Sequence, residues 1–119
     1  MATGKHTAAA RKSGILQGTL DLMVLKTLDA MGPLHGYGIA RRLEQIGEPA
    51  MEVNQGTLYA ALIRLLQKRW IASASGTSEN NRRAKFYSIT PAGRRQLVVE
   101  TENWARVSGM IGRLLRMTR

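Results

Sequence analysis

Residues 54–69 carry apolar side chains along a single helical face, and this pattern constrains the fold of the chain more than any other. The apolar positions follow the spacing i, i+3, i+4, i+7 and i+8, at Leu58, Ala61, Leu62, Leu65 and Leu66. The opposite face is small and polar, with Gly56, Ala60, Arg64 and Gln67. A helix that buries one face and presents a small, polar one is suited to the major groove of DNA.

Two helices are expected before this stretch and two strands after it. The helices cover residues 19–31, with Thr19 as the cap and Gly32 and Pro33 at the end, and residues 36–46. The strands cover residues 70–73 and 85–89, and the polar loop 76–83 between them is long enough to project as a wing. The predicted fold is therefore mainly α with a small β-hairpin wing, a winged helix-turn-helix domain over residues 14–90.

A long final helix is expected over residues 91–115, with Thr90 as its cap and Pro91 in its first turn. It carries a heptad-like seam at Leu97, Thr101, Trp104, Ser108, Ile111 and Leu115, flanked by Val107 and Leu114. An apolar seam of this length needs a partner in water, so residues 91–119 are predicted to form a homodimer. Residues 1–13 have no apolar period and are expected to be a flexible basic tail.

The charge balance predicts an anionic partner. Eighteen Lys and Arg oppose eight Asp and Glu, which gives a net charge of +10, and thirteen of the eighteen are Arg. No segment resembles a signal peptide or a membrane span, so a cytoplasmic protein without membrane contact is expected. There is no cysteine, and His6 and His35 are far apart, so neither a metal nor a cofactor is expected. No nucleophile–base pair or phosphate loop points to an enzyme.

Three motifs in the same order and register resemble the PadR family, the phenolic acid decarboxylase regulator family. They are Gly36-Tyr37-Gly38-Ile39, Gln55-Gly56-Thr57-Leu58-Tyr59 with Ala61-Leu62 and Arg64-Leu65, and Arg83-Ala84-Lys85-Phe86-Tyr87-Ser88-Ile89-Thr90 with Gly93. The resemblance covers roughly residues 15–100, and the Trp-containing final helix is similar to that of small family members. It implies a homodimeric regulator, usually a repressor that releases its operator when an effector binds.

Three positions depart from the family pattern. Ala60 stands where Pro is frequent, and Leu66 where Glu is frequent. Arg69 stands where Gly usually ends the recognition helix, so it must either adopt a left-handed backbone or let the helix end differently.

Candidate DNA-binding residues lie on the second helix, the third helix and the wing. They are Tyr37, Asn54, Gln55, Gly56, Thr57, Tyr59, Arg64, Asn81, Arg82, Arg83 and Lys85. The start of the third helix can present backbone N–H groups to a phosphate, and the wing cations can meet phosphates or the minor groove. Thr57 could instead serve as a local cap, while Tyr59 and Tyr37 could pack against the core.

Trp104 lies in the middle of the seam, and two interpretations remain open for it. It either packs the dimer, or pairs with its copy across a two-fold axis to line a pocket for a small, flat, apolar or aromatic effector. The predicted function is an effector-responsive repressor of double-stranded operator DNA. The alternative is a basic winged-helix module that binds RNA or a protein partner, because a fold does not fix a function.

Overall fold

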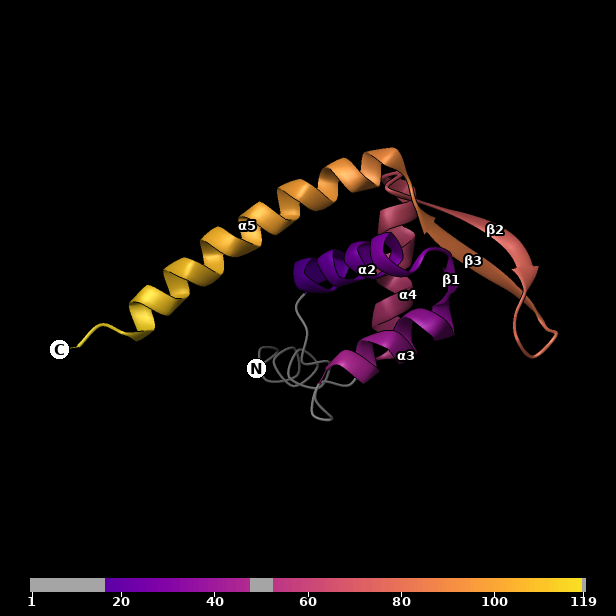
Figure 1. Ribbon diagram of the computed structural model, residues 1–119, viewed down its shortest axis with the longest axis horizontal. Helices are drawn as coiled ribbons and strands as arrows, with labels where there is room; N and C mark the ends of the chain where they lie inside the picture. Colours follow the sequence, from indigo (N-terminus) through magenta and orange to yellow (C-terminus); the bar gives the residue numbers. More distant parts are fainter. Residues whose placement is uncertain (1–16, 48–52, 119) are drawn as a thin grey trace, which may run out of the picture.

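The computed structural model describes residues 17–47 and 53–118. The elements are α2 (Gln17–Met31), β1 (Leu34–His35), α3 (Gly36–Ile46), α4 (Gln55–Gln67), β2 (Ile71–Thr77), β3 (Arg83–Ile89) and α5 (Pro91–Leu115). Three helices form a bundle, the sheet extends from one end of it, and α5 runs past α2 and projects beyond the other end (Figure 1). The predicted winged helix-turn-helix with a long C-terminal helix is confirmed, whereas the tail 1–13 lies outside the described residues.

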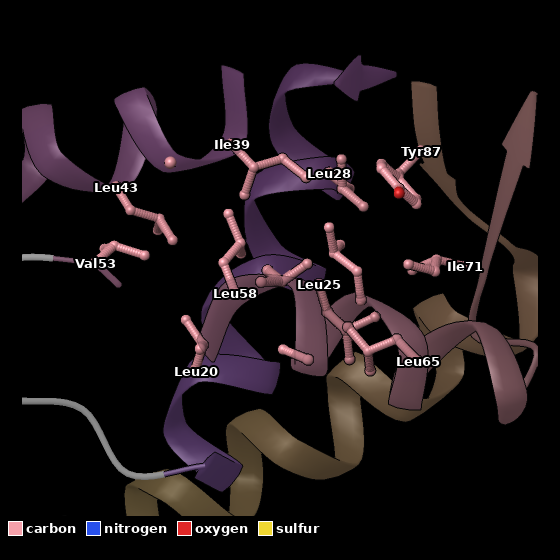
Figure 2. Close-up of a cluster of buried hydrophobic side chains, with 14 of the residues drawn as sticks. Leu20, Leu25, Leu28, Ile39, Leu43, Val53, Leu58, Leu65, Ile71 and Tyr87 are labelled. Carbon is pink, nitrogen blue, oxygen red and sulfur yellow. The ribbon is translucent and has the colours of Figure 1, made fainter. Parts of the chain in front are cut away.

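The core lies where α2, α3 and α4 meet and extends to the sheet. Leu20, Leu25 and Leu28 of α2 face Leu58 and Leu65 of α4 (Figure 2). Ile39 and Leu43 of α3 close one side of this cluster, and Ile71 and Tyr87 of the sheet lie at its far end. The apolar stripe of α4 is thus the buried centre of the domain, as its spacing predicted.

Local chemistry sets the bounds of α2 and α3. Gly32 has φ of +82° and ends α2 by donating its N–H to Leu28 O at 3.0 Å, just before Pro33. The expected cap at Thr19 was wrong, because α2 already includes Gln17. At the start of α3, His35 Nδ1 accepts the Gly38 N–H at 2.9 Å, so this histidine is an N-cap.

Arg69, which stands where the family usually has glycine, adopts the left-handed conformation with φ of +62°. Its N–H donates to Leu66 O at 3.0 Å, and the Trp70 N–H donates to Leu65 O at 3.1 Å. This pair of bonds is a Schellman motif, which usually has glycine at the left-handed position. The helix therefore ends where a glycine would end it, with an arginine under backbone strain.

The sheet has the order β1-β3-β2 and is antiparallel throughout. Both wing strands are longer than predicted, because the pairing continues out to Thr77 opposite Arg83. The expected long loop 76–83 is therefore a tight turn, in which Ser78 N–H donates to Arg82 O at 2.8 Å and Asn81 takes φ of +59°. The wing is a two-stranded ribbon with a short tip.

The first turn of α5 is anchored against the end of α4. Thr90 Oγ1 accepts the Gly93 N–H at 3.0 Å and donates to Arg69 O at 2.8 Å. A Cβ added to Gly93 would lie 2.0 Å from Trp70 O, so the backbones touch here. Leu97 was expected in a dimer seam, and this was wrong, since it is only 7% exposed in the core of its own chain.

Candidate nucleic-acid interface

A groove of about 600 Å³ separates the wing from the helices. It is lined by His35, Gly36, Tyr37, Tyr59, Ser78, Glu79, Asn80, Arg82, Arg83, Ala84, Lys85 and Tyr87. Five of the candidate DNA-binding residues from three separate parts of the sequence meet here: Tyr37, Tyr59, Arg82, Arg83 and Lys85. Arg83 and Lys85 lie two residues apart in β3 and therefore share one face of the strand.

Tyr37 and Tyr59, two of the tyrosines that line the groove, are both exposed, and neither is a core residue. Tyr37 is 58% exposed, stacks on His35 and accepts a hydrogen bond from Arg41 Nη1 at 3.4 Å. That hydrogen bond raises the pKa of the Arg41 guanidinium, a residue of α3 that the sequence did not single out. Tyr59 is half exposed and packs its hydroxyl against Gly36, where an added Cβ would lie 3.1 Å from Tyr59 Oη.

Tyr87 forms the floor of the groove and links it to the core. Burial raises the pKa of its hydroxyl, and the neighbouring Tyr59 raises it further. The neutral phenol is therefore favoured in the folded state, and the floor of the groove carries no negative charge below the ordinary pKa of tyrosine.

The start of α4 is capped by a side chain that sequence reasoning assigned to DNA. Asn54 Oδ1 accepts the Thr57 N–H at 3.1 Å and the Thr57 hydroxyl at 3.4 Å. The side-chain oxygen of Asn54 and the hydroxyl of Thr57 therefore both take part in the cap. The N–H groups of Gln55 and Gly56 precede the first intrahelical bond, and both residues are exposed. This leaves backbone donors at the helix start, where its dipole favours an anion.

The outward face of α4 differs from the predicted one in a single important residue. At about 100° per residue, Gly56, Ala60, Ile63 and Gln67 point away from the core, and all four are exposed. Ile63 is 54% exposed and was missed, because apolar residues on a helix are normally assigned to its buried side. Gly56 has no unusual backbone angle, so no conformational need for glycine exists there.

Arg64 does not belong to this outward face, which corrects its predicted role. Its Nη2 lies 2.7 Å from Asp21 Oδ1, and its Nε donates to Asp21 Oδ2 at 3.4 Å. Both side chains are largely shielded from solvent, so the guanidinium is committed to joining α4 to α2. The partner lies 43 residues away in sequence, and no local pattern predicts it.

The comparison with known families decides the classification. The model of the transcriptional regulator PadR-like family matches residues 24–99. The chain belongs to the PadR-like family.

Solved structures of regulators are similar to this chain, and so is part of a bacterial transposon protein. A PadR-like transcriptional regulator from Bacillus cereus is 26% identical, with a TM-score of 0.75 over 89% of this chain and all of that one. A transcriptional regulator from Clostridium thermocellum is 27% identical, with a TM-score of 0.77 over 87% of this chain and 97% of that one. A 37.1 kDa protein in a Streptomyces fradiae transposon is 38% identical over 90 residues, and this PadR-like chain spans only 24% of its length.

This PadR-like chain has a second hollow, of about 550 Å³, between α2, the end of α3 and α5. It is lined by Leu22, Met23, Lys26, Thr27, Leu43, Ile46, Gly47, Val53, Leu97, Thr101 and Trp104. Two interpretations were open for Trp104, packing of the dimer or pairing with its copy to line a pocket, and within one chain it forms a wall of this largely apolar hollow. Lys26 is the single charged lining residue among the described ones.

Two further features concern the part of the chain that the structure describes. None of its helices is long and apolar enough to cross a membrane. Within residues 17–47 and 53–118, no three His, Cys, Asp or Glu side chains gather in a way that could hold a metal ion.

Proposed function

We propose that this PadR-like protein is a homodimeric, sequence-specific regulator that binds double-stranded operator DNA with α4 in the major groove and the wing on the flanking backbone. The groove that gathers Tyr37, Tyr59, Arg82, Arg83 and Lys85 beside the start of α4 carries the proposal. The net charge of +10 supports an anionic partner.

Each part of this surface has its own role in the proposed complex. Arg82, Arg83 and Lys85 neutralise phosphates or enter the minor groove, which fixes the register of the domain on the duplex. The exposed N–H groups of Gln55 and Gly56 meet a phosphate at the start of α4. Tyr37 and Tyr59 donate their hydroxyls to backbone oxygens from the walls of the groove.

The exposed apolar side chains at the end of α5 support dimerisation. Beyond Leu97, the helix leaves most of its apolar side chains in solvent: Trp104 at 51%, and Val107, Met110, Ile111, Leu114 and Leu115, the last at 81%. Met110 was not part of the predicted seam, but it extends the same apolar face. A second copy of the chain covers this face in the proposal, and its two-fold symmetry predicts an operator with two inverted half-sites.

Effector-dependent repression is the finer part of the proposal. The second hollow is large enough for a small aromatic molecule, and its walls include Trp104, which also belongs to the exposed face of α5. A ligand there would contact both the DNA-binding domain and the dimer helix. Quenching of tryptophan fluorescence by added aromatic compounds, abolished in Trp104→Phe, tests this part separately.

Selection of bound duplexes from a random pool tests DNA recognition directly. The expected product is an inverted repeat whose binding weakens steeply with salt. A pool in which no duplex motif is enriched would favour the alternative, a basic winged-helix module that binds RNA or a protein partner.

Gly56→Leu is the matched variant for the proposed major-groove contact. Position 56 faces away from the core, and an added Cβ would lie 3.2 Å from Asn54 Oδ1, the acceptor of the α4 cap, so the variant should stay folded with at most a weakened cap. We expect operator binding to be abolished by steric exclusion while circular dichroism stays unchanged. A folded variant with wild-type affinity would show that α4 does not enter the groove.

A further inference from the structure

The outward face of α4 is apolar at its centre, which is unusual for a helix that faces a polyanion. Ala60 and Ile63 lie there, flanked by Gly56 toward the helix start and Gln67 toward its end. The side chain of Ile63 is 54% exposed, so it has no role in the core that would explain an isoleucine. Tyr59, one helical turn before Ile63, lines the groove together with the basic wing, so we expect the occupant of this face to carry phosphates.

The cations of α4 are not available to recognise guanine. Arg64 is the one Arg or Lys within Gln55–Gln67, and it is paired with Asp21 at 2.7 Å. Lys68, at the C-cap, lies over the Trp70 ring with its Nζ 4.7 Å from the centroid. The usual bidentate contact of Arg or Lys with guanine O6 and N7 therefore has no donor on this helix.

The groups that remain fit A·T base pairs. The thymine 5-methyl group is the apolar feature of the major groove, and side chains such as alanine contact it directly. The amides of Gln55 and Gln67 can pair with adenine N6 and N7. Ala60 and Ile63 are about 4.5 Å apart along the helix axis, close to the rise of about 3.4 Å between successive bases.

We propose that α4 recognises thymine, through contact of Ala60 and Ile63 with the 5-methyl groups of neighbouring A·T pairs. This inference rests on the proposed function and adds the base identity at the centre of each half-site. Gly56 lets the helix backbone approach closely enough for these two short side chains to reach the bases. The wing holds the phosphates, while the centre of α4 carries the sequence preference.

Replacing single thymines of the selected operator by deoxyuridine tests the proposal, because it removes one methyl group and no hydrogen-bonding atom. We expect one or two positions in each half-site at which the wild-type Kd rises about 3- to 5-fold. In Ile63→Ala, the penalty at one of these positions should fall below about 1.5-fold. Val98→Ala, an exposed apolar residue of α5, is the control and should keep the full penalty.

The outcomes separate this inference from the function on which it rests. If no duplex is selected, the proposed function fails. If a duplex binds but all deoxyuridine substitutions change the Kd by less than about 1.5-fold, recognition of the methyl groups is refuted. It is also refuted if Ile63→Ala keeps the penalty, or if that variant changes only the oligomeric state in sedimentation.

Discussion

At the residue scale, arginines of the same chain are committed to different interactions by their neighbours. Arg82 and Arg83 are exposed at and beside the tip of the wing, whereas Arg64 is paired with Asp21 between two helices. We predict that Arg82→Ala with Arg83→Ala flattens the plot of log affinity against log salt by about 0.9 for each phosphate that is no longer neutralised. The melting temperature should not change, since both side chains lie in solvent.

Arg64→Ala is the matched control for the wing variant. It should leave the salt slope unchanged and lower the free energy of unfolding by about 1 kcal/mol, because Asp21 loses its partner in a partly shielded site. Salt titrations by fluorescence anisotropy and urea unfolding measure the two effects. An unchanged slope in the wing variant would show that the wing points away from DNA.

Arg69 illustrates strain at a single residue. We predict that Arg69→Gly raises the free energy of unfolding by up to about 1 kcal/mol, since glycine takes the left-handed conformation without steric cost. The gain is partly offset by the greater freedom of glycine in the unfolded chain. Urea denaturation measures it, and a destabilised variant would indicate that the arginine side chain makes an interaction that outweighs the strain.

At the element scale, the junction of α5 with the end of α4 tolerates no added atom. We predict that Gly93→Ala lowers the free energy of unfolding by about 1–3 kcal/mol, because the new Cβ would clash with the Trp70 carbonyl. Gly109→Ala, in the same helix, is the control. Its Cβ would meet only Arg113 Nη1 at 3.6 Å, so alanine should stabilise α5 by up to about 1 kcal/mol. Equal effects of the two substitutions in thermal melts would contradict this.

The elements that the sequence predicted well are those whose ends are marked by local residues. The bounds of α3 and α5 were predicted to the residue, since turn and cap residues such as Thr90 mark them. The wing strands were predicted too short, because Gly76 and Thr77 resemble turn residues and only pairing with β3 makes them strand. Periodicity cannot report such pairing.

The candidate site shows the same division between local and long-range information. Motifs and charge predicted the wing cations and both groove tyrosines, all of which the structure brings to one groove. The pairing of Arg64 with Asp21, and the burial of Leu97 in its own chain, depend on tertiary contacts that no spacing reveals.

At the scale of the whole molecule, α5 is the element that projects from the domain (Figure 1). We predict that Leu114→Asp shifts the protein toward monomer and weakens operator binding through reduced avidity, because a charge would be buried in the dimer seam. Val98→Asp, outside that seam on the same helix, should have little effect. Sedimentation at micromolar concentration measures the change. A wild-type protein that stays monomeric there would refute the dimer.

The smallest strand has a consequence for regulation. β1 has only two residues, yet it joins the link between α2 and α3 to β3, the middle strand of the sheet, with Leu34 opposite Tyr87 and His35 opposite Phe86. This pairing joins the wing to the helices, so we expect the two to move together. In the proposed dimer, a ligand would then act on DNA binding by altering the separation and angle of the two DNA-binding domains. A ligand would then change the spacing between half-sites that the dimer prefers. We expect the effect of the ligand on affinity to differ between operators that have different spacer lengths.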